Sequence, residues 1–374
     1  MKPISLSLPF VFMLILVSCQ NQRTPVKAQT QQPIVTSSSR NTNSASDSVC
    51  IAAVGDLMLG TSYPNAQSLP PDSAVNSFAA VQPELKKADI TFGNLEGTLA
   101  DTSAHPSSFK LHQRSKAYLF RMPTNYVNVL KSAGFNVLSL ANNHSYDFGD
   151  SGLKSTTHIL DSIGIHYAGL KIHPTTIFTA KGVRYGFCAF APNSQTVSIH
   201  DLEKAAAIIR ELKRQCDIVI VSFHGGGEGA GFEHVPFKDE SFIGENRGNV
   251  YAFAHNAIDA GADVVLGNGP HVSRAMEVYH KRLIAYSLGN FCTYRSVSVS
   301  GVCGMAPLLK IYTNKKGEFL TGRIIACRQS HDKGLMRDTA NRVINRIRDL
   351  TNTDFPQPSV TITKTGEIVP FNKG

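Results

Sequence analysis

The sequence predicts a layered α/β fold, in which mixed β-sheets are flanked by helices. Two observations favour this fold class. Short apolar runs typical of buried strands alternate with helical stretches over most of the chain. Polar residues also recur directly after the predicted strands, at the sheet edge where α/β proteins bind their ligands. The sequence shows no internal repeat.

The first half of the folded part alternates strands and helices. The run 50–54 is a buried strand that ends at Gly55 and Asp56, and the amphipathic stretch 75–87 predicts a helix. The remaining elements of this half are a strand at 90–93, a helix at 125–133, a strand at 137–140 and a helix at 152–163.

The second half continues the alternation as far as about residue 270. Strands are predicted at 183–190 and 218–223 with a helix at 202–214 between them. A helix at 250–260 precedes a strand at 264–266, and later strands are predicted at 283–287 and 308–313. Residues 333–351 are expected to be partly helical, and 359–371 alternate like a strand.

The first nineteen residues predict an export signal. Lys2 gives a basic start, and the apolar run 4–17 is too short to span a membrane. Leu16 to Cys19 resembles the lipobox of bacterial lipoproteins, which implies a lipid on Cys19 and an extracytoplasmic, membrane-anchored protein in the periplasm or at the cell surface. An ordinary cleaved signal peptide is the alternative.

Four segments are expected along the chain. After the signal, residues 20–48 are rich in Gln, Asn, Ser, Thr and Pro and have little to bury, which predicts a flexible tether. Residues 49–331 would form the main domain. Residues 332–374 would add a helix and a strand that pack on it.

The net charge of +9 does not indicate nucleic-acid binding, because Lys and Arg are scattered without interleaved aromatics. An anionic envelope polymer or a membrane surface is the better expected partner. If Cys19 is lipidated, six cysteines remain, and these could form disulfides in an oxidising compartment. They lack CxxC spacing, so a zinc knuckle is not expected. The sequence leaves the disulfide pairing open.

The polar residues after the strands have the chemistry of a divalent metal site. They offer carboxylate, amide and imidazole groups but no thiolate. One or two metal ions held there would favour hydrolysis or transfer at a phosphoryl or acyl centre. The residues are Asp56, Asn94, Glu96, Asn143, His144, His224, Asn268, His271 and Asn290.

Six motifs between residues 51 and 291 resemble, in the same order, those of the poly-γ-glutamate capsule-synthesis (CapA) family. Together they cover about two thirds of the chain. The motifs are GDLMLG from Gly55, NLE from Asn94, ANNHSYDFG from Ala141, His224 with Glu228, GNGPH from Gly267 and SLGNF from Ser287.

The resemblance implies a calcineurin-like metallophosphatase fold of four αββα layers, and a site holding one or two divalent ions such as Mn, Zn, Fe or Mg. By this likeness Asp56 and Glu96 are metal carboxylates, with Glu96 in the bridging position. The remaining implied metal ligands are Asn143, His224, His271 and Asn268. The implied catalytic or substrate-contacting groups are His144, as general acid or oxyanion contact, with Asp147, Glu228 and Asn290.

Three departures from related patterns make the site a variant. The tryptophan expected after His224 is absent, because the chain contains none. Asn268 replaces a family histidine, and an amide binds borderline metals less well than imidazole. Leu57 and Met58 also stand where ordinary calcineurin-like phosphatases have a DxH pair. The site would hold one metal, or two with one bound weakly.

Structural roles remain alternatives for single residues. Asp56 and Asp147 could cap turns or helices, and Asn290 could serve turn geometry. His224 could be a core histidine bonded to a carbonyl group. Gly225 to Gly227 lack the lysine of a phosphate loop and instead allow close approach to the backbone.

Three functions fit the sequence. The first is a metal-dependent hydrolase or transferase acting on amide or phosphoester bonds of an envelope polymer such as poly-γ-glutamate, with capsule-synthesis proteins as partners. The second is a non-catalytic, lipid-anchored accessory protein that binds an anionic polymer. The third is a simple phosphomonoester hydrolase, which rests on fold analogy alone.

Overall fold

The computed structural model describes residues 48–112, 118–331 and 333–371. The predicted export signal, Cys19 and residues 20–47 of the predicted tether lie outside these ranges. Ser48, expected at the end of the tether, is the first residue of a strand. Within the described ranges, no helix is long and apolar enough to cross a membrane.

The first of two large sheets has ten strands. In its middle, β1 (Ser48–Met58) runs parallel to β2 (Ile90–Leu95) and antiparallel to β16 (Met305–Asn314). Outward from β16 lie β17 (Phe319–Ser330), β20 (Glu367–Pro370) and β19 (Val360–Ile362), and outward from β2 lie β5 (Val137–Ser139) and β6 (His166–Ala168). Off this path, β15 (Asn290–Thr293) pairs with β1 and β18 (Gly334–Arg337) pairs with β17.

The second large sheet has six strands, four of which are mutually parallel. Its order is β13 (Met276–Tyr279), β14 (Arg282–Ala285), β12 (Val264–Asn268), β9 (Ile218–His224), β8 (Val183–Phe190) and β7 (Thr175–Ala180). Two small two-stranded sheets pair β3 (Thr98–Leu99) with β4 (Arg121–Met122) and β10 (Glu240–Phe242) with β11 (Glu245–Gly248).

Side-chain alternation along the central strands builds the layers. Ile51 of β1 and Ile220 of β9 belong to one core between the two sheets. Their neighbours Ala52 and Val221 point the opposite way, into two outer cores under helices. Successive strand residues face opposite sides of a sheet, so strands covered on both faces read as continuous apolar runs.

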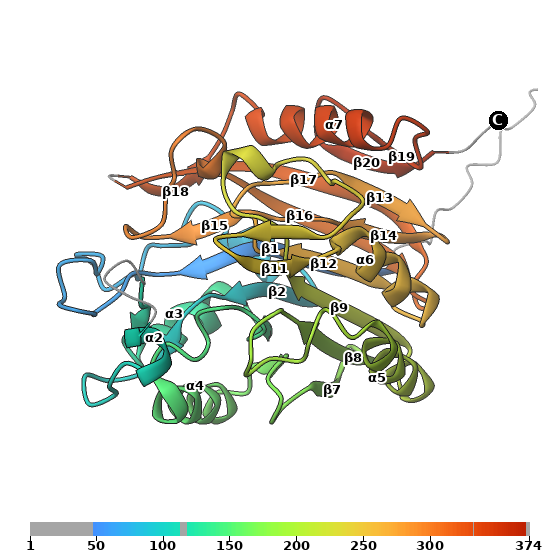
Figure 1. The fold of residues 1–374 in the computed structure, drawn as a ribbon. Coiled ribbons are helices and arrows are strands. Elements are labelled where there is room, and N and C mark those ends of the chain that lie inside the picture. The colour runs from blue at the N-terminus through green and yellow to red at the C-terminus, as the bar shows by residue number, and fades with distance from the viewer. Residues whose placement is uncertain (1–47, 113–117, 332, 372–374) are drawn as a thin grey trace, which may run out of the picture. The chain divides into compact units, whose positions relative to one another are not determined.

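Helices cover the outer face of each sheet. The first sheet carries α1 (Gln82–Lys86), α3 (Tyr126–Ala133) and α4 (Gly149–Ser162), and the second carries α5 (Leu202–Gln215) and α6 (Val250–Asp259). α7 (Arg342–Asp354) adds apolar residues to the core between the sheets and lies over β17 and β20 (Figure 1). This order of helices, sheet, sheet and helices confirms the predicted layered fold. The short helices are α2 (Ser108–His112), η1 (Ala230–Phe232) and η2 (Gly301–Gly304).

Two predicted elements were wrong. The expected helix at 75–87 is reduced to α1, because Asp72 accepts backbone hydrogen bonds from Ala74 and Asn76 that hold the preceding chain in turns. Pro83 lies in the first turn of α1, where proline is tolerated. The expected strand at 359–371 is a pair of antiparallel strands, since the chain turns at Gly366 with a φ of 87°.

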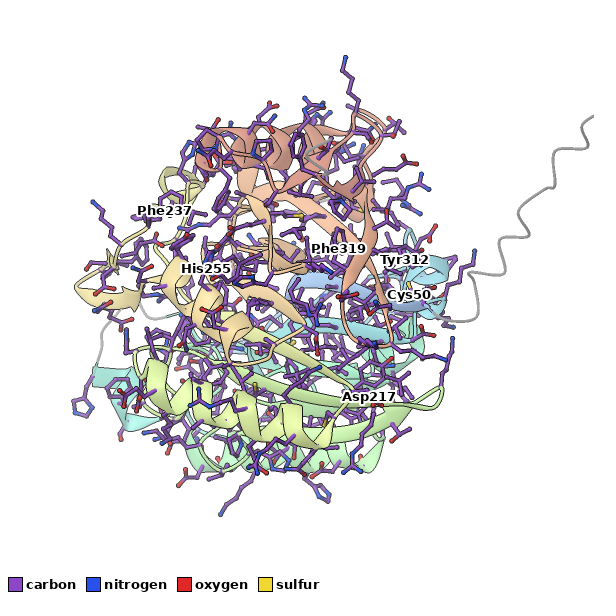
Figure 2. The ribbon with its side chains drawn as sticks, turned by 90° about the vertical axis from the view of Figure 1, so that its right-hand side faces the viewer. Cys50, Asp217, Phe237, His255, Tyr312 and Phe319 are labelled. Carbon is purple, nitrogen blue, oxygen red and sulfur yellow. The ribbon has the colours of Figure 1, made fainter. Side chains whose placement is uncertain are left out.

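The six cysteines within the described residues are free thiols, so none forms the disulfide that the sequence left open. Cys50 is half-buried and lies beside Tyr312, its register partner on β16 (Figure 2). Cys188 and Cys327 are buried, and burial raises the pKa of both thiols. These two thiols therefore pack as small apolar groups.

One close backbone approach holds the end of β1 against the segment before β15. The backbone N–H of Asp56 donates to the carbonyl of Gly289 at 2.9 Å. A Cβ added to Gly55 would lie 1.7 Å from the Gly289 oxygen, so only glycine fits at position 55.

We therefore expect Gly55→Ala to destabilise the protein by about 3 kcal/mol, because the backbone at Gly289 must move to admit the methyl group. Gly231→Ala is the matched control, since a Cβ there meets nothing within 4 Å. Chemical denaturation of both variants measures the effect. Equal unfolding midpoints for the two would contradict this account.

Candidate metal centre

Asp56 lies at the end of β1 between two register partners. Asn94 is opposite it on β2 and Asn290 is opposite it on β15, and the register of β1 shifts at Asp56 on both sides. The Asp56 side chain is fully buried, and its Oδ1 accepts a hydrogen bond of 2.8 Å from Nδ2 of Asn94. Such irregularities in pairing re-aim side chains near functional sites.

His271 comes to this carboxylate from the second sheet, in the loop after β12. Its Nδ1 lies 3.0 Å from Oδ2 of Asp56 and 3.2 Å from Oδ1 of Asn290. His271 has a φ of 57°, which is unusual for a residue other than glycine. Strained backbone of this kind is held in place by its surroundings and concentrates at functional sites.

Glu96 completes a group of three side chains that could hold a metal ion. One potential ligand atom each from Asp56, Glu96 and His271 lies within 4.8 Å of the others. Neither carboxylate oxygen of Glu96 has a hydrogen-bond partner although both are buried. Burial and the neighbouring Asp56 raise the pKa of Glu96 well above its usual range. An orphaned buried carboxylate beside a second carboxylate and an imidazole fits a divalent metal site.

The pKa of His271 shows how strongly this centre attracts positive charge. Burial by itself lowers the pKa, but the carboxylates of Glu96 and Asp56 raise it to about 10. Below that pH the imidazole carries a proton in the metal-free protein. A metal ion would have to displace that proton, so its affinity should increase as the pH rises towards 10.

Three further predicted ligands make no hydrogen bond or ion pair to this group, and the ring centroid of His224, one of the three, lies 6.3 Å from that of His271. His224 and Asn268 are register partners on β9 and β12. Both ring nitrogens of His224 and the Oδ1 atoms of Asn268 and Asn143 are buried without a hydrogen-bond partner. The carbonyl-bonded core role for His224 is therefore not observed. Burial, with Arg247 nearby, lowers the pKa of His224 well below its usual range, which keeps the imidazole in the neutral form that metals bind.

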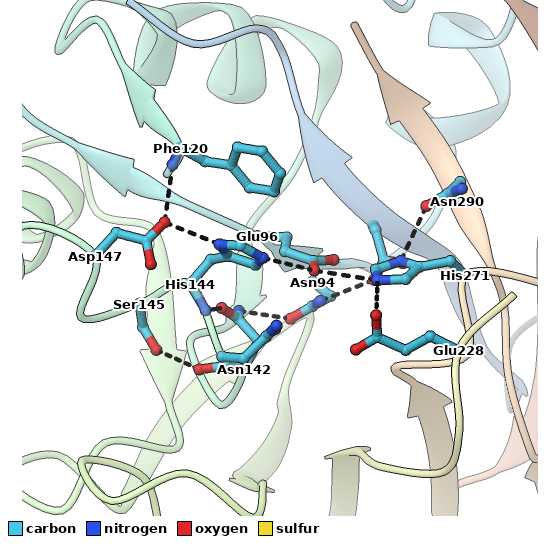
Figure 3. A network of polar contacts seen from close by, with 12 residues as sticks. Asn94, Glu96, Phe120, Asn142, His144, Ser145, Asp147, Glu228, His271 and Asn290 are labelled. Atoms are coloured by element: carbon cyan, nitrogen blue, oxygen red, sulfur yellow. Dashed lines mark hydrogen bonds and ion pairs between the residues drawn. The ribbon is translucent and has the colours of Figure 1, made fainter. Parts of the chain in front are cut away.

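His144 faces Glu96 from the other side, with its Nε2 3.9 Å from Oε1 of Glu96 (Figure 3). Its Nδ1 lies 2.8 Å from Oδ2 of Asp147, and its ring stacks on Phe120. Burial lowers the pKa of His144. A neutral ring that donates from Nδ1 to Asp147 presents the lone pair of Nε2 to the centre.

Asp147 is held by two residues that no motif indicated. Its Oδ2 accepts from the backbone N–H of Phe120 at 2.8 Å, and its Oδ1 pairs with Nζ of Lys110 at 3.1 Å. Lys110 also donates to the carbonyl of Asn143. These contacts make Asp147 an orienting group for the imidazole of His144, and a helix-capping role is not observed.

Asn142 is a site residue that the sequence analysis missed. Its Nδ2 donates to Oδ1 of Asn94 and to the carbonyl of Leu95, and its Oδ1 accepts from the backbone of His144. A chain of hydrogen bonds thus runs from Asp56 through Asn94 and Asn142 to the His144 backbone. Asn142 stands next to Asn143 in the same sequence motif, and this position could have identified it as a site residue.

Glu228 and Asn290 lie on either side of His271. Oε2 of Glu228 is 3.8 Å from Nε2 of His271, and Oε1 is 2.9 Å from Nη2 of Arg247. Asn290 donates from Nδ2 to the carbonyls of Ser298 and Cys303, so it has a structural role as well as its contact with His271. Arg247 belongs to no motif and was also missed.

Comparison with known proteins agrees with these motifs. The family model of the bacterial capsule synthesis protein PGA_cap matches residues 50–295, the segment that carries every residue of the centre. The chain belongs to the PGA_cap family. In this chain, the motifs that resemble this family lie at the strand ends of both sheets.

Two curated relatives are similar to this PGA_cap chain over most of its length. The PGA biosynthesis protein CapA of Bacillus subtilis is 30% identical over 66% of this chain and 64% of its own length. The capsule biosynthesis protein CapA of Bacillus anthracis is 26% identical over 77% of this chain and 67% of its own length. The chain therefore spans about two thirds of the length of these relatives.

Among solved structures, a hypothetical protein from Thermus thermophilus is similar over 75% of this chain and all of its own, with 15% identity and a TM-score of 0.47. That likeness is too low to inform function.

We expect His271→Ala and Asp56→Asn to lower the affinity for Mn²⁺ or Zn²⁺ by about 100-fold or more, because the first removes one of the three grouped ligand atoms and the second replaces a charged carboxylate with a neutral, weaker amide donor. His255→Gln is the control, since His255 on α6 (Figure 2) lies outside the group and pairs with Glu277. Calorimetry at about pH 6 and pH 8 should also show about tenfold tighter wild-type binding per pH unit. Wild-type protein without bound metal at either pH would refute the site.

Proposed function

We propose that this protein is a metal-dependent hydrolase or transferase that acts on amide or phosphoester bonds of an anionic envelope polymer, poly-γ-glutamate or its precursor. The orphaned carboxylate of Glu96, set between His271 and His144, carries the proposal. Membership of the PGA_cap family and the names of the two CapA relatives support the polymer.

In this proposal, the residues of the centre are metal ligands. Asp56, Glu96 and His271 would hold the ion, with His224, Asn268 and Asn143 as further ligands if a second ion binds. A bound divalent ion supplies charge stabilisation of the reacting oxygen and lowers the pKa of water.

His144 provides the proton transfer in this proposal. Its Nε2 accepts a proton from the attacking group and can return it to the leaving group. Asp147 holds the ring in the productive tautomer through Nδ1, and Phe120 packs against the ring face. Burial keeps this imidazole neutral, and a neutral imidazole is the form that accepts a proton.

A non-catalytic accessory role is the second candidate. The net charge of +9 suits an anionic polymer. A Mycobacterium tuberculosis relative, 30% identical over 47% of this chain, is named a probable polyglutamine synthesis accessory protein. In this role the protein would bind the polymer and capsule-synthesis partners, and the polymer would bind equally well to variants of the metal centre.

The proposed location is extracytoplasmic, with residues 20–47 tethering the domain to a lipid on Cys19. The basic start, the short apolar run and Leu16 to Cys19 support it. Mass spectrometry of the mature protein should find acylated Cys19 as its first residue, and Cys19→Ala should release the protein from the membrane fraction. An unmodified N-terminus after residue 19 would indicate an ordinary signal peptide.

We expect His144→Gln and Asp147→Asn to reduce turnover of poly-γ-glutamate by about 100-fold or more, because each removes or misorients the proton acceptor. Metal affinity should stay within a few-fold of wild type, with His255→Gln again as control. Chain-length analysis of the polymer and amine release measure the reaction, and generic phosphate esters test the simple phosphatase. Polymer binding without turnover in metal-loaded wild type would favour the accessory role.

A further inference from the structure

Two arginines are almost fully buried near the centre, and they differ in how their donors are used. Arg274 is 0% exposed and Arg247 is 2% exposed. Burying a guanidinium group is costly unless its donors are paired. Arg274 meets this requirement, because it binds both oxygens of Glu240 at 2.8 and 2.7 Å and the carbonyl of Phe232 at 2.7 Å.

Arg247 meets this requirement only in part. Its Nε and Nη2 make no hydrogen bond although both are buried. Oε1 of Glu228 lies 2.9 Å from Nη2 as an ion pair, but without the alignment of a hydrogen bond. The other acidic neighbour, Glu245, is 3.7 Å from Nη1 and its side chain is 51% exposed. A buried guanidinium with unused donors is a receptor for an anion.

The carboxylate of Glu228 shows where such an anion fits. One of its oxygens pairs with Arg247. The other lies 3.8 Å from Nε2 of His271, as Figure 3 shows for these two side chains. Nε2 of His271 is in turn 3.6 Å from Glu96. An oxyanion in this position therefore lies between the buried guanidinium and the candidate metal centre.

Glu228 is free to leave that position. Its side chain is 20% exposed, whereas Arg247 is almost completely buried. Gly227 precedes it and Gly229, with a φ of 93°, follows it. The backbone is held on both sides, because the N–H of Gly229 donates to the carbonyl of Pro270 and the N–H of Gly227 donates to Glu240. The partly exposed Glu228 side chain can therefore leave by rotating about its own bonds while the backbone stays in place.

We propose that Arg247 binds an oxyanion group of the substrate, a carboxylate or a phosphate, which replaces the Glu228 carboxylate next to the metal centre. The inference rests on the proposed function and narrows its substrate to one with an anionic group beside the scissile bond. Each unit of poly-γ-glutamate has an α-carboxylate close to its amide bonds. The planar guanidinium suits two-point binding of such a group.

Opposite effects of two variants test the proposal. Calorimetry with metal-loaded protein uses γ-glutamylglutamate as the carboxylate probe and inorganic phosphate as the phosphate probe. Arg247→Lys should weaken binding of the preferred probe about 10- to 100-fold, because the two-point contact is lost. Glu228→Gln should tighten it several-fold, because a competing negative charge is removed.

Arg346→Lys is the matched control, since Arg346 pairs with Glu233 through two hydrogen bonds and touches no residue of the centre. Metal affinity and thermal unfolding are measured for each variant. If Arg247→Lys does not fold, Glu228→Gln decides alone. Weaker binding in Glu228→Gln, or no binding of either probe by metal-loaded wild type, overturns the inference. Failure of wild type to bind metal would instead overturn the proposed function.

Discussion

The burial of two carboxylates, Asp56 and Glu96, beside one imidazole is the constraint on which the rest of the centre depends. Removing these charges from water is costly, and only Asp56 is compensated by a protein hydrogen-bond donor. Glu96 either keeps a proton or depends on a nearby positive charge, which without an ion is the protonated imidazole of His271. An ion bound at this centre would relieve that cost, so its binding would also stabilise the folded protein.

The fold provides this centre by bringing the strand ends of two sheets to one place. Asp56 and Asn94 come from the first sheet, and His224, Asn268 and His271 come from the second or its loops. The segment before β15 joins the two at the backbone, because Gly289 accepts a hydrogen bond from Asp56 of the first sheet and Leu288 donates one to Gly267 of the second. The candidate ligands are thus fixed by backbone contacts to both sheets, while the partly exposed side chain of Glu228 is the adaptable part.

Sequence patterns predicted the buried strands well because strands covered on both faces are continuous apolar runs. They missed β17, in which exposed residues such as Arg323 alternate with buried ones at the start. The centre was indicated wherever a motif followed a strand, as at Asp56 and His271. Arg247, Lys110 and Phe120 follow no such strand, and their importance depends on contacts between segments far apart in the chain, which a single sequence does not reveal.

β16 lies outside the segment that matches the family model, although it is a central strand of the first sheet. The matched segment ends at residue 295, ahead of β16, yet β16 is the antiparallel partner of β1 along Ser48 to Ala53. A gene fragment cut at the end of the match would leave a buried central strand of the protein with an open edge, ready to pair with another chain. The segment matched by the family model is therefore shorter than the segment that the fold needs.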